Sequence, residues 1–241
     1  MSIDMTTMAC LATELDMHTQ EHLRQYWICS VCHLSGSIIS ISAMPCSCLL
    51  DRHKPGQYCK ILCHDGELRP YSIINTPNSS RSVEFHIRIK ISNRALMLEH
   101  FRIGNTLYLS DFQGNCVFDF NDFIPTVFIA EGLGMAAFFP IIESFSTRQE
   151  ASLLWISRDE EQKKYHIHCK HWKNQFPKLS ISSFDHLNNI EAVALNACFQ
   201  YLQKSESVRV YFAGSHDLKL KIQSVLSTYI EKNQARFFSD V

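Results

Sequence analysis

Short apolar segments rich in β-branched and aromatic residues follow one another from about Tyr26 to Phe118. Turn residues separate them at intervals that are typical of a small antiparallel barrel. One helix is predicted within this half, from Asn93 to Phe101, because its apolar residues fall at helical spacing. The remainder is predicted to be all-β, with strands in WICSVC, SIISIS, GQYCKILC, YSIIN, VEFHIRIK and NTLYLSDF.

The pattern changes at Pro125. The segments TVFIA, SLLWIS and VRVYFAG are continuously apolar, as expected of strands that are buried on both faces of a sheet. Helical segments alternate with them, which predicts a parallel sheet with crossover helices. An interior proline costs a helix about 3 kcal/mol, so the first helix should kink or restart near Pro140. The predicted helices cover 135–147, 160–172, 190–204 and 217–233.

These two patterns predict two domains, which is consistent with a length of 241 residues. Residues 1–24 show a weak helical pattern without a strong apolar face and are interpreted as an N-terminal extension. Residues 25–120 form the predicted barrel domain, and residues 125–241 form the predicted α/β domain.

Composition excludes several classes of protein. With 23 basic and 24 acidic residues the net charge is −1, so no overall field attracts the chain to nucleic acid or to an acidic membrane. No apolar run is long enough to span a membrane, and the first residues lack the features of a secretory signal. A cytoplasmic protein without a nucleic-acid partner is therefore predicted.

The ten cysteines are interpreted as reduced and mostly buried thiols. Four of them lie near one another in the sequence as candidates for a metal site, but a Cys-x-Cys pair is not the usual zinc spacing and no histidine pair completes it. No iron–sulfur spacing occurs either. The sequence therefore predicts no metal site, although a minor zinc alternative remains for Cys29, Cys32, Cys46 and Cys48.

The sharpest chemical motif is Arg69-Pro70-Tyr71-Ser72, which follows a Pro-Gly-Gln-Tyr turn at 55–58. A guanidinium offers several donors to a phosphate, and an aromatic ring can pack on an isoalloxazine. A small hydroxyl can hydrogen-bond the flavin N5 atom, which accepts hydride. The motif therefore predicts flavin binding, with Ser72 as the catalytic residue; the alternative is a surface turn that contains these letters.

At this motif the sequence resembles the ferredoxin-NADP reductase superfamily, whose flavin signature is Arg-x-Tyr/Phe-Ser at the same place in the barrel. The resemblance extends from about Trp27 onward and is strongest to single-chain NAD(P)H-flavin reductases. It implies an antiparallel Greek-key flavin-binding β-barrel followed by a parallel-sheet nucleotide-binding domain. It also implies that the backbone of His86, Ile87 and Arg88 borders the flavin, whereas simple alternation would put the polar side chains on a solvated face.

A second motif is Glu131-Gly132-Leu133-Gly134-Met135, which follows a predicted strand and opens a predicted helix. Such a turn directs backbone N–H groups toward a pyrophosphate. It resembles the family's Gly-Thr-Gly turn, with Leu133 in place of the threonine and Glu131 where many relatives have glycine. A carboxylate beside a pyrophosphate is repulsive unless it points away.

Two further segments resemble the family's nucleotide site. Arg158 lies in a Trp-Ile-Ser-Arg-Asp-Glu-Glu run, and the resemblance implies a contact to the adenosine ribose or a 2′-phosphate. A salt bridge at the start of the following helix is an equal alternative for this arginine. Ala213, Gly214 and Ser215 resemble the strand and loop beside the nicotinamide, where glycine permits close approach.

The predicted function is that of an NAD(P)H-dependent flavin reductase or a single-chain reductase component. Its cofactors would be FAD or FMN together with NADH or NADPH, and its electron acceptor would be free flavin or a protein. The alternative is a catalytically weakened reductase-like fold that acts as a flavin-binding or interaction module. Glu131 and Leu133 motivate this alternative, and the sequence does not decide between the two.

Overall fold

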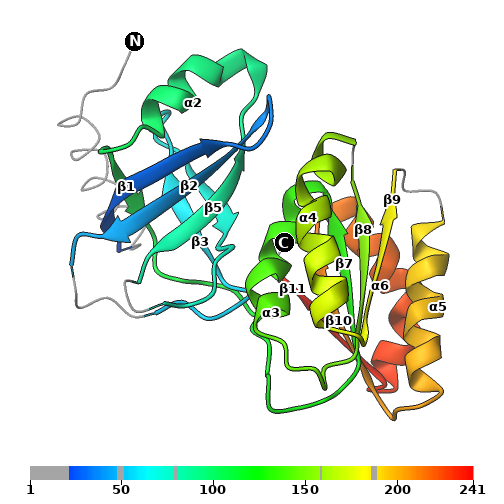
Figure 1. Ribbon diagram of the computed structural model, residues 1–241. Coiled ribbons are helices and arrows are strands. Elements are labelled where there is room, and N and C mark those ends of the chain that lie inside the picture. Colours follow the sequence, from blue (N-terminus) through cyan, green and yellow to red (C-terminus); the bar gives the residue numbers. More distant parts are fainter. Residues whose placement is uncertain (1–21, 48–51, 79–80, 158, 186–188, 241) are drawn as a thin grey trace. The chain divides into compact units, whose positions relative to one another are not determined.

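The computed structural model describes residues 22–47, 52–78, 81–157, 159–185 and 189–240 (Figure 1). Arg158 and nearly all of the predicted N-terminal extension lie outside these residues. The chain divides into two compact units, Met1–Gly114 and Asn115–Val241. Among the described helices, none is long and apolar enough to cross a membrane.

The first unit is an antiparallel β-structure with the strand order β4-β3-β6-β1-β2-β5. The N–H of Ile74, just after β4, donates to the carbonyl of Glu84 in β5 at 2.9 Å, so the two ends of this order are linked. The predicted barrel is thereby confirmed. Its elements are β1 (Arg24–His33), β2 (Ile38–Pro45), β3 (Tyr58–Leu62), β4 (Leu68–Ser72), β5 (Val83–Arg88), η1 (Ile91–Asn93), α2 (Arg94–His100) and β6 (Thr106–Leu109).

Buried and less buried side chains alternate along the strands, and the buried ones form the core of this unit. In β5 the side chains of Phe85 and Ile87 are fully buried, whereas His86 and Arg88 lie on the half-buried opposite face. The helix predicted from Asn93 to Phe101 is present as α2. Its end is closed by Asn105, whose side-chain amide donates to the last helical carbonyls at 2.9 and 3.1 Å.

The second unit is a parallel sheet with the order β11-β10-β7-β8-β9, flanked by helices on both faces (Figure 1). The strand order reverses at β7, and ligands of such sheets bind at the carboxyl ends of strands beside a reversal of this kind. Strands β9 and β11 were not predicted. The elements are β7 (Thr126–Glu131), η2 (Gly132–Phe138), α3 (Phe139–Glu143), β8 (Ala151–Ile156), α4 (Asp159–Gln175), β9 (Leu179–Phe184), α5 (Ile190–Leu202), β10 (Val208–Ala213), α6 (His216–Glu231) and β11 (Ala235–Ser239).

The two faces of this sheet have different cores. Val127 and Ile129 of β7 pack against apolar residues of α5 and α6. Phe128 points to the other face, where its ring contacts the rings of Phe118, Phe138, Phe145 and Tyr211. Because both faces of these strands are covered, their sequences are continuously apolar, as the pattern predicted.

One predicted helix differs from the structure. Residues 135–147 were predicted as one helix, but the chain forms the 3₁₀-helix η2 up to Phe138 and the short helix α3 from Phe139 to Glu143. Pro140 lies in the first turn of α3, where its missing N–H leaves no intrahelical bond unmade. The predicted restart near Pro140 is confirmed, and the predicted length is wrong.

A buried arginine stabilises the start of the second unit. Arg209 of β10 is 3% exposed, and its guanidinium forms an ion pair with the Asp122 carboxylate. The guanidinium also lies 4.6 Å from the ring centroid of Phe118 and donates to the carbonyl of Asp119. These contacts fix the segment that leads into β7, because an unpaired buried charge would be costly.

Candidate functional site

The Arg-Pro-Tyr-Ser motif lies in strand β4, which pairs with β3 in an antiparallel hairpin. Ser72 is opposite Tyr58 in this pairing, so the two sequence motifs are neighbours. Gly56 precedes β3 with φ +92, and the N–H of Lys54 donates to the side-chain oxygen of Gln57 at 2.7 Å. A positive φ favours glycine, which explains the Pro-Gly-Gln-Tyr turn. The motif therefore lies in a strand and not in a turn.

Arg69 forms a bidentate ion pair with Asp65 across this hairpin, with N–O distances of 2.7 and 2.5 Å. The Arg69 guanidinium holds the pKa of the Asp65 carboxyl at about 2. The Arg69 side chain remains 41% exposed. Since a guanidinium carries five N–H donors, the pair orients Arg69 and leaves donors for a second anion such as a phosphate.

Tyr71 and Ser72 differ in their surroundings. The Tyr71 ring packs against the barrel core, and its hydroxyl lies 4.0 Å from the Cys63 sulfur. Burial raises the pKa of Tyr71, so its phenol is neutral near pH 7. The half-buried Ser72 hydroxyl makes no hydrogen bond to any other described residue. The structure therefore combines a fixed ring with a hydroxyl that is available to a ligand.

The loop after β4 is joined to β5, the second strand that was predicted to border the flavin. The side-chain oxygen of Asn75 accepts from the N–H of Glu84 at 2.8 Å, and its amide donates to the carbonyl of Ser82 at 3.0 Å. His86, Ile87 and Arg88 follow in β5, where only the Ile87 side chain enters the core. Any contact of Ile87 to a ligand would thus be through its backbone.

His53 was not predicted as part of this region. It is 3% exposed, and its Nε2 lies 2.9 Å from the carbonyl oxygen of Asn75. Burial lowers the pKa of His53, which is therefore a neutral residue that supports the Asn75 loop. No local pattern in the sequence distinguishes it, because its partner is 22 residues away.

In the second unit, the glycine turn at the end of β7 packs on the end of β10. Gly132 has φ +56, and its carbonyl accepts from the indole N–H of Trp155 at 3.1 Å. A Cβ atom on Gly134 would lie 2.2 Å from the carbonyl oxygen of Ala213, so glycine is required for this approach. Met135 is fully buried, whereas Leu133 is half-buried. The two predicted nucleotide segments are thus brought together.

Glu131 points across this edge to the start of α6. Its carboxylate accepts a hydrogen bond from the N–H of Ser215 at 2.8 Å. A Cβ on Gly214 would lie 2.8 Å from the Cβ of Glu131, so Gly214 makes room for this side chain. The positive end of a 16-residue helix stabilises a carboxylate at that point. Glu131 thus caps α6, in a place that would also favour an anionic ligand.

Ser157 is a further polar residue at this edge and was not predicted. It follows β8, is 3% exposed, and its hydroxyl has no hydrogen-bond partner among the described residues. Leaving a buried hydroxyl unpaired costs about 1–3 kcal/mol, so a ligand contact would explain its presence. The signal that could have found it is its position directly before Arg158.

The arrangement has the chemistry of two sites. The barrel unit offers an oriented guanidinium, a fixed ring and an available hydroxyl, which fit a flavin. The α/β unit offers close-packed glycine turns at the carboxyl ends of strands, which fit a nucleotide apart from the capping carboxylate. Within the described residues, no group of three or more histidine, cysteine or acidic side chains could hold a metal ion.

Comparisons with known proteins agree with this fold. No protein-family profile matches the sequence. The ferredoxin reductase in carbazole 1,9a-dioxygenase superposes with a TM-score of 0.66 at 19% identity, over 91% of this chain and 70% of the other. Ferredoxin-NADP⁺ reductase from Plasmodium falciparum, as an H286K mutant in complex with 2′P-AMP, superposes with a TM-score of 0.72 at 12% identity. This superposition covers 90% of this chain and 96% of the other. Flavohemoglobin from Malassezia yamatoensis with bound FAD and heme superposes with a TM-score of 0.69 at 16% identity, over 94% of this chain and 63% of the other.

The chain therefore has the ferredoxin-NADP reductase fold, a flavin-binding type of barrel followed by a nucleotide-binding type of domain. Its sequence is similar to terephthalate 1,2-dioxygenase reductase components 1 and 2 from Comamonas sp, at 24% and 23% identity over 171 residues. These alignments cover 69% of the chain and 49% of each relative. The chain thus spans about half the length of the curated relatives that it matches.

Proposed function

We propose that this chain is an NAD(P)H-dependent flavin reductase or the reductase part of a larger electron-transfer protein. The observation that carries the proposal is the hairpin of β3 and β4, which presents Arg69, Tyr71 and Ser72 in one strand. The similarity to dioxygenase reductase components supports the same class of activity.

The barrel unit would bind the flavin, which supplies hydride acceptance at N5 and electron release when bound. FAD is favoured over FMN because one solved relative carries FAD. Arg69 would direct its remaining donors to a flavin phosphate while Asp65 holds its orientation. Tyr71 would support a face of the ring system, and Ser72 would donate a hydrogen bond to N5.

The α/β unit would bind NADH or NADPH at the carboxyl ends of its strands. Gly132, Gly134 and Gly214 would form the backbone turns beside the nucleotide, and Leu133, Met135 and Ala213 would contribute backbone groups. Ser215 and Arg158 would complete the site. Glu131 opposes binding, because its carboxylate already occupies the Ser215 N–H and would repel a phosphate. Weak nucleotide affinity is therefore part of the proposal.

Electrons would leave through the flavin to free flavin or to an electron-accepting protein. A protein acceptor is favoured because the similar curated proteins are components of a dioxygenase.

The proposal is tested by the absorption spectrum of the purified protein with added FAD and by NADH and NADPH oxidation assays. We expect saturable flavin binding and flavin-dependent oxidation. Ser72→Ala should slow flavin reduction in stopped-flow experiments and leave flavin affinity nearly unchanged. Ser30→Ala, at an exposed position in β1, is the matched control. Absence of both flavin binding and nucleotide oxidation would refute the proposal.

A second candidate function is a flavin-binding or interaction module without turnover. The hydrogen bond from the Ser215 N–H to Glu131 favours it, since that N–H is part of the proposed nucleotide site. This candidate predicts that the protein binds flavin but that neither wild type nor Glu131→Gly binds NADH or NADPH. Nucleotide-dependent reduction of the flavin would exclude it.

A further inference from the structure

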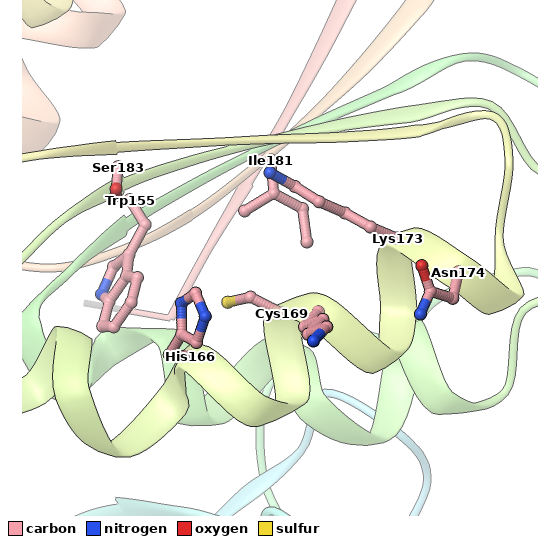
Figure 2. A pocket seen from close by; sticks show the side chains of 8 residues that line it. Trp155, His166, Cys169, Lys173, Asn174, Ile181 and Ser183 are labelled. Carbon is pink, nitrogen blue, oxygen red and sulfur yellow. The ribbon is translucent and has the colours of Figure 1, made fainter.

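The α/β unit contains a cavity of about 510 Å³ between α4 and the strands β8 and β9 (Figure 2). Cavities of about 300–1,000 Å³ accommodate small molecules. Neither of the glycine-containing turns, 132–135 and 213–215, contributes to its lining. The lining residues are Trp155, His166, Cys169, Lys170, Lys173, Asn174, Ile181 and Ser183.

Helical and strand periodicity bring these side chains together. His166, Cys169, Lys170 and Lys173 recur at the spacing of one face of a helix. In β9 the residues Ile181 and Ser183 are two apart and share one face of the strand. Because β9 is the last strand of the described sheet, no further strand in that part of the chain covers the groove that β9 forms with α4.

The groove has a positive rim. Lys170, Lys173 and His166 are all exposed, and none of the lining residues that the structure describes is acidic. Figure 2 shows Lys173 extending from α4 toward Ile181. Burial raises the pKa of the Cys169 thiol to about 11, so this group adds no negative charge near pH 7.

The inner wall of the groove is apolar. Trp155 is 2% exposed and is held in place by its hydrogen bond to the Gly132 carbonyl. Ile181 and the neutral thiol of Cys169 continue this wall, as seen in Figure 2. Asn174 and Ser183 add polar groups at the margin. An apolar wall with a few convergent polar groups is the usual composition of a small-molecule site.

We propose that this groove binds a small organic anion, a molecule with a flat apolar body and one acidic group. The body would contact Trp155 and Ile181, and the acidic group would lie between the ammonium groups of Lys170 and Lys173. The site is separate from the one at the glycine turns, and it is independent of the proposed reductase activity.

A fluorescence titration with 8-anilinonaphthalene-1-sulfonate tests the site, and uncharged N-phenyl-1-naphthylamine serves as the matched probe. Wild type should bind the sulfonate saturably and more tightly than the neutral probe. The double variant Lys170→Gln/Lys173→Gln should bind the sulfonate about tenfold more weakly, since two exposed cations are removed. Lys164→Gln, on the opposite side of α4, makes the same type of charge change outside the groove and should leave affinity unchanged.

Ser183→Phe should block both probes, because it fills the groove without removing a charge. The proposal is overturned if the double variant binds as wild type does, if Lys164→Gln weakens binding equally, or if Ser183→Phe has no effect. Displacement of the sulfonate by adenosine 2′,5′-bisphosphate would also overturn it, because the groove would then belong to the nucleotide site. Circular dichroism of each variant confirms that it is folded.

Discussion

Glu131 allows the sharpest test, because its substitution should change stability and nucleotide affinity in opposite directions. Glu131→Gln removes the charge and keeps an oxygen that can accept from the Ser215 N–H, now 2.8 Å away. Hydrogen bonds to charged groups contribute about 1.5–3 kcal/mol, and a carboxylate at a helix N-terminus adds about 0.3–1 kcal/mol. Solvent screening at this exposed bond reduces both contributions. The free energy of unfolding should therefore fall by about 1 kcal/mol.

Nucleotide affinity should rise in the same variant. A phosphate about 6 Å from the carboxylate is repelled by about 0.7 kcal/mol at the dielectric constant of water and by about 3 kcal/mol at an effective value of 20. Because the site is exposed, the gain should lie near the lower limit, at about three- to tenfold in Kd. The gain should shrink with added salt, since the Debye length falls from about 10 Å at 0.1 M to about 3 Å at 1 M.

The assay is calorimetric titration with NADH and NADPH, combined with urea denaturation. Glu150→Gln is the matched control, because Glu150 directly precedes β8 at the opposite, amino-terminal edge of the strands. Equal affinities of wild type and Glu131→Gln would refute the repulsion argument. An equal gain in Glu150→Gln would also refute it, since the effect would then reflect net charge alone.

Four other variants test separate parts of the structure. Arg69→Ala should weaken flavin affinity at least tenfold, because a charge-assisted contact contributes about 1.5–3 kcal/mol; an unchanged fluorescence titration would remove Arg69 from the site. Gly134→Ala should lower the free energy of unfolding by about 1–3 kcal/mol, the usual cost of overpacking, because the added Cβ would lie 2.2 Å from the Ala213 carbonyl oxygen. Burial and the neighbouring His64 lower the pKa of His100 to about 4, so the unfolded chain binds a proton that the folded chain does not. Wild type should thus lose stability as the pH falls from about 6.5 to about 4, and urea denaturation of His100→Gln should show a smaller loss. Arg209→Met should reduce the free energy of unfolding by about 2–4 kcal/mol, because the Asp122 carboxylate loses its partner; a neutral effect in urea denaturation would contradict the role of the ion pair.

Several features of this protein could be predicted from local sequence. The change from alternating to continuous apolar segments at Pro125 separates the barrel from the parallel sheet, because a strand with one covered face and a strand with two leave different patterns. The Arg-Pro-Tyr-Ser motif was correctly predicted to lie in the barrel, but its strand was predicted as YSIIN at 71–75, whereas β4 spans Leu68–Ser72 and the motif ends it. Helix bounds at 135–147 were wrong because helical spacing alone does not distinguish a 3₁₀ turn from an α-helix.

The remaining features depend on the order of the strands. The sequence by itself predicted a barrel followed by a parallel sheet, most of their strands and the glycine turns, because these follow from periodicity and backbone preference. Only the tertiary structure showed that Glu131 reaches Ser215, 84 residues away, and that Gly134 packs against the Ala213 carbonyl. It also placed the buried Arg209 beside Asp122. Contacts of this kind arise where β10 returns beside β7, and no local pattern records which strands become neighbours.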